Sequence, residues 1–337
     1  MSVKVGVSIF GHLFPMSALV DLGVSAEAAG AESVWVGEYH RNPWVLGSLI
    51  ASRTQRVTIG TSIALAFVRS PLVTALAALD LDEAAEQRFV LGLGPQVRRG
   101  IENWHGMAYP DKPARRMAEF VEATRTSMRT HLPDPQTYVG DYHRIDLTGF
   151  NRHPAPAREV PVHVAAVREG MIRMAQQVAD GVIGHIFWSR RYVQDVVTPL
   201  LEGVRDDFER SVTVLCSVQE DPGLARIDAK RTLAHYASTR TYRDILAADG
   251  FGSAADDCRD AVRAADHEAM VRAVPDAMLD TYAIAGPPDE LHDRLAAVAG
   301  HMDRAILVPA YIGTPMARAE QAYTTMFAAL RSRGGTT

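Results

Sequence analysis

The chain has 337 residues, and 47% of them are hydrophobic, which supplies enough apolar material for a large core. Its formal net charge of −5, without a basic run, argues against binding to nucleic acid or to an anionic membrane. The only cysteines, Cys216 and Cys258, lack metal-ligand spacing, which favours a reduced compartment. The first ten residues do not have a signal-peptide pattern, and no stretch is apolar for long enough to span a membrane, so we expect a cytoplasmic protein without a membrane span.

Alternating and continuous apolar runs predict eight strands along the chain. They cover residues 3–9, 33–37, 57–65, 88–94, 161–166, 180–186, 212–218 and 304–308. Helical periodicity and capping residues predict helices between them. These cover residues 17–29, 43–53, 71–86, 113–131, 169–178, 191–209 with a kink at Pro199, 224–280 with breaks near Gly250 and Pro275, 288–299 and 315–331.

Two segments interrupt this alternation. A short hairpin with Gly140-Asp141 at its turn opens an irregular excursion over residues 138–159, and residues 224–280 form the second insertion. Eight strands alternating with helices therefore predict one α/β domain over residues 1–337, a (β/α)8 TIM barrel with insertions after strands 4 and 7. The alternative is an open doubly wound sheet, but Gly92-Leu93-Gly94 lacks the third glycine of a dinucleotide-binding fingerprint.

The third expected strand, 57–65, is apolar except for small residues at Gly60-Thr61-Ser62. Small side chains at this point leave room for a flat ligand beside the end of the strand. The other interpretation is an ordinary core strand buried on both faces. Ser70-Pro71 then opens a helix as its N-cap and first residue.

In a barrel the active site lies at the carboxyl ends of the strands. Side chains that follow these ends can carry protons or line a pocket, and they belong to His12, Glu38-Tyr39-His40, Ser62-Ile63, Pro95-Gln96, Ala166-Val167-Arg168 and His185-Ile186-Phe187. Glu38 can accept or position a proton, and Tyr39 and His40 can donate one. The alternative is that Glu38 only pairs with an arginine and that His40 is a surface residue.

The helix after the fifth strand begins at Glu169-Gly170-Met171, next to Arg168. Free backbone N–H groups at a helix start and a nearby guanidinium can bind an anion. The alternative is an ordinary helix start with a solvated arginine, which has the same sequence pattern. His40, His163 and His185 lie on or near strands without the paired spacing of a metal-dependent hydrolase, so we expect no metal. No phosphate-binding P-loop and no nucleophile elbow are present.

Several stretches together resemble the bacterial luciferase-like superfamily of flavin- and deazaflavin-dependent oxidoreductases. They occur in order over nearly the whole chain: AGAESVWVGEYH, RVTIGTSIALAFVRSP, RFVLGLGPQV, YVGDYHRIDL, PVHVAA, VADGVIGHIF and AIAGPPDEL. The segments LGLGPQVRRGIENWHGMAYPDKPARRMAEFVEATR and HYASTRTYRDIL are most similar to the subgroup that uses coenzyme F420.

The resemblance implies a non-prolyl cis peptide at Ser62-Ile63, which backs the deazaflavin ring. The acidic residue of the family's second strand matches Glu38. Tyr39 stands where some members have a proton-donating histidine, and His40 follows it. Gln96 and Val97 stand where the family's sugar-phosphate dehydrogenases have a catalytic glutamate, which implies a different substrate.

The family's cofactor-phosphate loop matches Val167-Arg168-Glu169-Gly170, followed by Met171. We therefore expect hydride transfer between F420 and a small organic substrate, such as reduction of an activated C=C or C=N bond. The alternatives are an FMN-dependent monooxygenase that uses O2 and a barrel that binds a ligand without catalysis. The resemblance also implies a homodimer.

Overall fold

The computed structural model describes residues 3–10, 14–150 and 155–332. Its internal contacts divide the chain into two compact units, which are described separately below. Unit 1 comprises Met1–Val34, Gly184–Pro199 and Arg210–Thr337, and unit 2 comprises Trp35–Ile183 and Leu200–Glu209. His12 lies outside the described residues.

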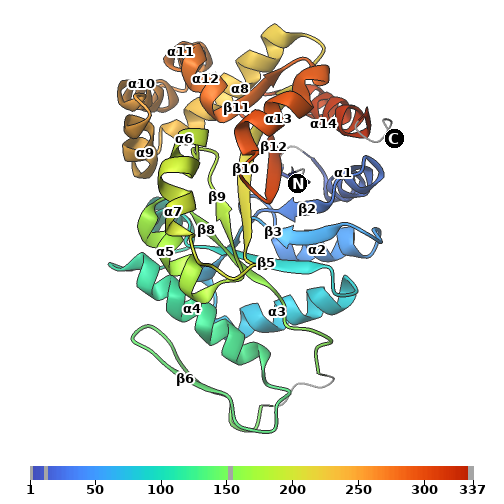
Figure 1. The fold of residues 1–337 in the computed structure, drawn as a ribbon, viewed down its shortest axis with the longest axis vertical. Helices are drawn as coiled ribbons and strands as arrows, with labels where there is room; N and C mark the ends of the chain where they lie inside the picture. The colour runs from blue at the N-terminus through green and yellow to red at the C-terminus, as the bar shows by residue number, and fades with distance from the viewer. Residues whose placement is uncertain (1–2, 11–13, 151–154, 333–337) are drawn as a thin grey trace. The chain divides into compact units, whose positions relative to one another are not determined.

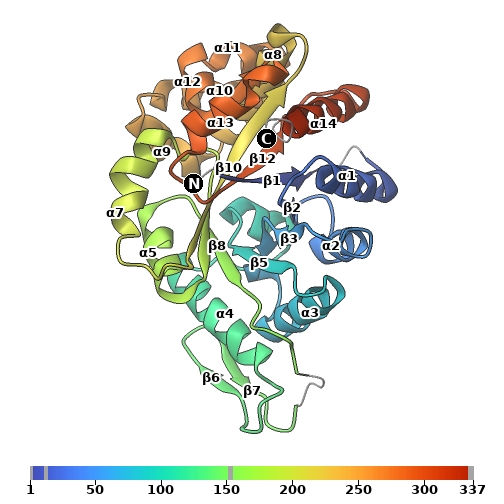
Figure 2. The ribbon, with the colours of Figure 1, turned by 45° about the vertical axis from the view of Figure 1, so that its right-hand side comes forward.

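Unit 2 carries the strands and helices of the middle of the chain, with β2 and β9 at its borders (Figure 1). In chain order they are β2 (Ser33–Val36), α2 (Pro43–Ala51), β3 (Thr58–Thr61), β4 (Ala64–Leu65), α3 (Pro71–Ala84), β5 (Phe89–Gly94), a π-helix (Gly100–Trp104), α4 (Pro113–Met128), β6 (Thr137–Val139), β7 (Arg144–Asp146), β8 (Val162–Ala166), α5 (Glu169–Val178) and β9 (Gly181–Gly184). β5 pairs in parallel with β3, β4 and β8, and β6 and β7 form the expected antiparallel hairpin (Figure 2).

Unit 1 contains the N-terminal strand and most of the C-terminal half. Its elements are β1 (Lys4–Ile9), α1 (Met16–Ala28), α6 (Arg190–Tyr192), a π-helix (Val193–Val197), α7 (Thr198–Leu200) at its border, β10 (Glu209–Val218), α8 (Pro222–Ala237), α9 (Arg243–Ala248), α10 (Gly252–Arg263), α11 (His267–Ala273), α12 (Asp276–Tyr282), β11 (Ala283–Gly286), α13 (Leu291–Ala299), β12 (Arg304–Pro309) and α14 (Met316–Arg331). β12 pairs in parallel with β1 and with β10, and β10 pairs in parallel with β11.

The order of parallel strands and intervening helices is that of a (β/α)8 barrel, with β1, β2, β3, β5, β8, β9, β10 and β12 as the successive strands. The two expected insertions follow the fourth and seventh of these strands, as the β6–β7 hairpin and as helices α8 to α12. Local capping also agrees with the sequence. The side chain of Asn42 accepts the N–H groups of Trp44 and Val45, and that of Ser70 accepts the N–H of Val73.

Three expectations are corrected. The third strand is interrupted at Ser62-Ile63, so that β3 and β4 are separate. The helix expected over residues 191–209 ends at Leu200, because a π-helical turn precedes Pro199 and Gly203 then takes a left-handed backbone with φ of 76°. The short strand β11 was not expected.

The structure assigns packing roles to two of the small residues of the third strand. A Cβ atom on Gly60 would lie 2.3 Å from the ring of Trp35, which is fully buried, so this glycine accommodates an indole ring. Thr61 Oγ1 donates to the carbonyl oxygen of Gly92 at 2.7 Å and accepts the N–H of Gly92 at 2.9 Å. The space expected for a ligand is therefore confined to the end of the strand.

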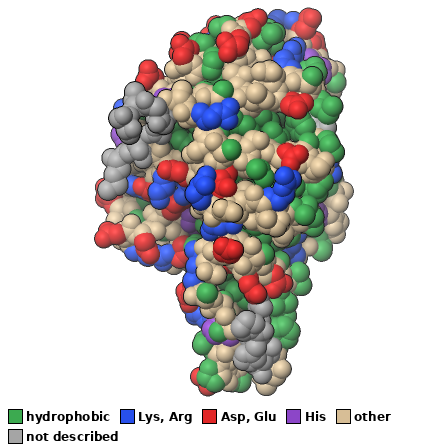
Figure 3. Space-filling model, turned by 90° about the vertical axis from the view of Figure 1, so that its right-hand side faces the viewer, with side chains coloured by type: hydrophobic (Ala, Val, Ile, Leu, Met, Phe, Trp, Pro, Cys, Tyr) green, Lys and Arg blue, Asp and Glu red, His purple; other side chains and the backbone are tan. Residues whose placement is uncertain are grey.

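None of the helices within the described ranges is long and apolar enough to cross a bilayer. Acidic and basic side chains alternate over the face shown in Figure 3, in keeping with the mild net charge.

Candidate active site

The candidate site lies in unit 2, where Glu38 follows β2. Its two carboxylate oxygens accept hydrogen bonds from the two terminal nitrogens of Arg69, at 2.5 and 2.6 Å. Oε2 also accepts the backbone N–H of Leu65 at 2.7 Å. The two side chains are only 14% and 15% exposed, so this bidentate ion pair is largely shielded from water. Glu38 thus pairs with an arginine, as one of the two interpretations of the sequence proposed.

The Glu38 ion pair fixes the chain between β3 and β4. The backbone N–H of Glu38 donates to Ile63 O, and that of Ser62 donates to Val36 O, both at 2.9 Å. The Ser62-Ile63 peptide bond is cis, as the resemblance implied. Side chain and backbone together therefore attach the end of β2 to the Ser62–Leu65 segment.

Glycine at position 94 leaves room for the Ile63 side chain. A Cβ atom on Gly94 would lie 2.1 Å from Ile63 Cδ1 and 3.3 Å from the Cβ atom of Ala165 in β8. The ends of β4, β5 and β8 consequently approach closely around the Ile63 side chain. A larger residue at position 94 would displace Ile63.

Tyr39 and His40 lie beside an aromatic residue that the sequence analysis did not select. The ring of Tyr39 is 4.2 Å from that of His40 and 5.4 Å from that of Trp104 (centroid distances). Tyr39 and Trp104 are 40% and 55% exposed, which is unusual for large aromatic rings. Partial burial raises the pKa of Tyr39, opposed by the nearby positive charge of Arg99. The phenol therefore keeps its proton at neutral pH and can donate it.

Gln96 follows β5 in a left-handed backbone conformation, with φ of 62°. A non-glycine residue rarely adopts this conformation, and here the Gln96 Oε1 atom accepts the N–H of Val97 at 3.0 Å. Gly100 permits the arrangement, because a Cβ atom there would lie 2.9 Å from Gln96 Cγ. Gln96 is thus held at the end of β5 by its own loop.

Positive charge gathers around Tyr109, which follows the same loop. The guanidinium of Arg98 lies 4.8 Å from the centre of its ring. Burial raises the pKa of Tyr109, while Arg98 and Arg168 lower it. The loop after β5 and the loop after β8 therefore share one cationic region.

Helix α5 begins in that region. Arg168 is its N-cap residue and has no capping hydrogen bond from its side chain. The carbonyl oxygen of Arg168 accepts the N–H groups of Met171 and Ile172. The described residues provide no acceptor for the N–H groups of Glu169 and Gly170, and a Cβ atom on Gly170 would meet nothing within 4 Å. This open helix start beside a guanidinium fits the chemistry of a phosphate group.

The structure thus brings together Glu38, Tyr39, His40 and Ser62-Ile63, and the contact of Tyr39 with Trp104 joins them to the loop that carries Gln96. Arg168 acts on Tyr109 together with Arg98, and Val167, Gly170 and Met171 are its neighbours in the chain at the start of α5. Arg69, Trp104 and Tyr109 were missed by the residue-level analysis, although all three stand in stretches that carry the resemblance, AFVRSP and WHGMAYP. Across the described ranges no three His, Cys, Asp or Glu side chains are grouped so that they could hold a metal ion.

His185 and Phe187 follow β9 and belong to unit 1. The His185 ring lies 4.3 Å from that of Tyr242 and 5.0 Å from that of Phe187, and the N–H of Phe187 donates to its Nδ1 atom at 3.4 Å. Burial among these rings lowers the pKa of His185 to about 3. The imidazole is therefore neutral at physiological pH.

This lowered pKa predicts an acid-sensitive contribution to stability. Between pH 6.5 and about 3 the unfolded chain binds a proton at His185 and the folded chain does not, so the free energy of unfolding falls as the pH is lowered. In urea denaturation at several pH values, His185→Phe should reduce this slope by about 1.4 kcal/mol per pH unit. An unchanged slope would show that His185 is protonated in the folded state.

Comparisons with known proteins show the family of the chain. The family model described as luciferase-like monooxygenase matches residues 3–305. An uncharacterized protein of Mycobacterium tuberculosis is 33% identical over 82% of this chain and 85% of its own length. An F420-dependent glucose-6-phosphate dehydrogenase of Intrasporangium calvum is 32% identical over 66% of this chain and 72% of its own length.

The solved structure of the coenzyme F420-dependent tetrahydromethanopterin reductase from Methanopyrus kandleri superposes with a TM-score of 0.77. Its sequence is 18% identical, and the match covers 99% of this chain and 98% of that chain. This likeness confirms the (β/α)8 barrel as the fold class. The chain belongs to the luciferase-like monooxygenase family.

Proposed function

We propose that this protein is an F420-dependent oxidoreductase, which transfers a hydride between the deazaflavin and a small organic substrate by reducing an activated C=C or C=N bond. The observation that carries the proposal is the cationic, open start of α5 next to the loop after β5, in a unit whose β3–β4 segment is fixed by Glu38. The donors there suit a phosphate-bearing cofactor. F420-dependent relatives such as the Intrasporangium calvum dehydrogenase support the choice of deazaflavin.

In this proposal two groups of residues hold the cofactor. Ser62 and Ile63 would support its ring, and Glu38 keeps that segment in place by accepting hydrogen bonds from Leu65 and Arg69. Gln96, at the end of β5, would contact the ring as well. The phosphate would be bound by Arg168 and by the N–H groups of Glu169 and Gly170, in the helix start that Val167 precedes and Met171 continues.

When bound, F420 supplies or accepts the hydride. The protein moves the accompanying proton, and Tyr39 and His40 are the candidates. Tyr39 is protonated at neutral pH, since the ordinary pKa of a tyrosine already lies well above 7 and burial raises it. Its ring packs against His40, which can return a proton to it from solvent. Glu38, bound at both oxygens, is assigned to positioning in preference to proton transfer.

The family is described as luciferase-like monooxygenase, so FMN-dependent monooxygenation is the second candidate function. The monooxygenase consumes O2 and the F420-dependent reductase does not, so measuring turnover with and without O2 distinguishes the two functions. With reduced F420 and a panel of activated alkenes and imines, we expect cofactor oxidation at the same rate in anaerobic and in aerated buffer. Substrate turnover that requires reduced FMN and consumes O2 would instead establish the monooxygenase.

The remaining expectations concern the assembly and its setting. We propose a homodimer in the cytoplasm that acts on a small molecule. Light scattering of the purified protein would give the mass of the assembly, and a mass equal to that of one chain would reject the dimer.

A further inference from the structure

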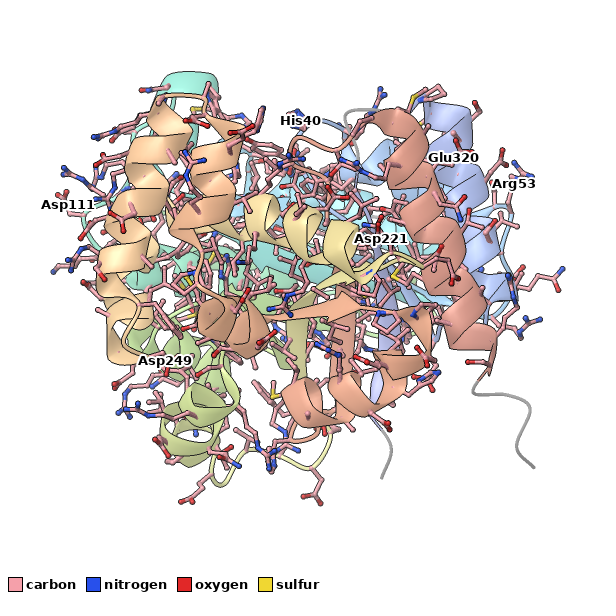
Figure 4. All side chains as sticks on the ribbon, turned by 90° about the horizontal axis from the view of Figure 1, so that it is seen from above. His40, Arg53, Asp111, Asp221, Asp249 and Glu320 are labelled. Atoms are coloured by element: carbon pink, nitrogen blue, oxygen red, sulfur yellow. The ribbon has the colours of Figure 1, made fainter. Side chains whose placement is uncertain are left out.

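Among the described residues of unit 1, a cluster of buried polar atoms has no hydrogen-bond partner, and it is separate from the residues proposed above for the cofactor. They are Asp228 Oδ1, Arg231 Nε, Thr314 Oγ1 and Arg318 Nε. Asp228 and Arg231 lie on α8, Thr314 lies in the loop after β12, and Arg318 lies in the first turn of α14. In Figure 4, Asp221 marks the start of α8 and Glu320 lies on α14. Buried polar atoms are nearly always satisfied, so the three donors among them, Arg231 Nε, Thr314 Oγ1 and Arg318 Nε, call for a bound acceptor.

The charges in the cluster do not balance. Asp228 is 1% exposed, and its Oδ2 atom lies 3.0 Å from Arg318 Nε, but without the alignment of a hydrogen bond. Its Oδ1 atom is 3.8 Å from the guanidinium of Arg231. Among the described residues, Asp228 is the only acidic partner of Arg231 and Arg318. One carboxylate therefore faces two guanidinium groups, and one positive charge is left over.

The guanidinium groups are shielded and yet reachable from solvent. The side chains of Arg231 and Arg318 are 21% and 28% exposed. The loop that carries Thr314 is tied to α8, because Thr232 Oγ1 accepts the N–H groups of Tyr311 and Ile312, both at 3.2 Å. A Cβ atom on Gly313 would lie 3.4 Å from Arg231 Cδ, so this loop packs directly on the arginine.

The start of α14 adds further donors. Its N-cap residue, Pro315, has no capping side chain, and its carbonyl oxygen accepts the N–H groups of Arg318 and Ala319. In the described structure the N–H groups of Met316 and Ala317 have no acceptor. Loops after the last two strands of a (β/α)8 barrel, together with a helix start, often form a phosphate site, and this cluster lies after β10 and β12.

We propose that Arg231, Arg318 and Thr314 form a second ligand site, which binds an oxyanion, a phosphate or a carboxylate group. Such a group would accept hydrogen bonds from both guanidinium groups, from the Thr314 hydroxyl and from the first N–H groups of α14. It would also neutralise the positive charge that Asp228 leaves uncompensated. The site is independent of the cofactor proposal, because it uses none of the same residues.

The test is a thermal denaturation of the full chain without cofactor, titrated with inorganic phosphate against sodium chloride of equal ionic strength. We expect a saturable rise of Tm with phosphate, and citrate or acetate in a parallel titration distinguishes a phosphate from a carboxylate ligand. Arg231→Gln and Arg318→Gln should each weaken the apparent phosphate affinity about tenfold. The control is Arg226→Gln on the same helix, since Arg226 pairs with Asp276 and Asp280.

Asp228→Asn separates a ligand site from a purely structural cluster. Removing the negative charge should tighten phosphate binding and let phosphate restore the stability that the substitution costs. The proposal is overturned if neither wild type nor Asp228→Asn shows a saturable anion effect, or if Arg231→Gln and Arg318→Gln respond to phosphate as wild type does. A parallel F420 titration should give the same affinity for wild type and Arg231→Gln. Failure of the anion site can therefore be distinguished from failure of the proposed function.

Discussion

Replacing Gly92 by alanine should destabilise the protein by about 3 kcal/mol or more, because the new methyl group has no space. Its Cβ atom would lie 1.8 Å from the carbonyl oxygen of Thr61, a backbone atom that cannot turn aside. Moving that strand would also break both hydrogen bonds between Thr61 and Gly92. Urea denaturation measures the loss.

The matched control is Gly170→Ala, where the added methyl group meets nothing within 4 Å. Its free energy of unfolding should stay within about 1 kcal/mol of that of wild type, because alanine is favoured over glycine in a helix. A Gly92→Ala protein as stable as wild type would mean that β3 and β5 are not paired as described.

Replacing Glu38 by glutamine should lower turnover and weaken F420 binding about tenfold, while the fold remains intact. The amide keeps one acceptor oxygen but turns an NH2 group toward the Arg69 guanidinium, so the bidentate pair and the hydrogen bond from Leu65 cannot both persist. The Ser62–Leu65 segment then loses part of its attachment and keeps only the backbone hydrogen bonds of Glu38 and Ser62 in full. Calorimetric titration with F420 and steady-state kinetics measure the two effects.

A positioning role has its own signature in these measurements. The affinity should fall while the pH dependence of kcat stays that of wild type, whereas loss of a proton-transferring group would change the pH profile. Glu159→Gln is the control, since Glu159 forms an exposed ion pair with Arg129 in the same unit. Wild-type affinity and turnover in Glu38→Gln would remove Glu38 from the mechanism.

Arg69 tests the same ion pair from its other side. Arg69→Gln should cost about 3 kcal/mol, because it leaves the shielded Glu38 carboxylate without its cation. In the double variant with Glu38→Gln the loss should be smaller than the sum of the two single losses, as expected for groups in direct contact. Additive losses would contradict the ion pair.

Local signals in the sequence were sufficient for most of the elements around the site. Asn42 and Ser70 are capping residues next to proline, and α2 and α3 begin where they indicate. The resemblance located the cis bond at Ser62-Ile63, which no local pattern could have shown. Arg69, in contrast, pairs with a residue 31 positions away, so its role depends on tertiary structure.

The remaining errors have similar causes. The helix after β9 stops early because Gly203 takes a left-handed conformation, whereas the preceding residues are compatible with a longer helix. β11 is only four residues long, and its pairing with Leu215–Val218 of β10 defines it. The space beside Gly60 was expected to hold a ligand, but it is occupied by the ring of Trp35, a residue 25 positions earlier in the sequence. For β11 and for Gly60 a distant contact decides the outcome, whereas at Gly203 the backbone conformation of a single residue does.

The proposed function is tested most directly by titrating the purified protein with F420 and, separately, with FMN, and following the fluorescence of each cofactor. We expect saturable quenching with F420 at concentrations where FMN produces little change, and weaker F420 binding in Glu38→Gln. Tight FMN binding with weak F420 binding would contradict the deazaflavin assignment and favour the monooxygenase. Binding of neither cofactor would reject the cofactor site altogether.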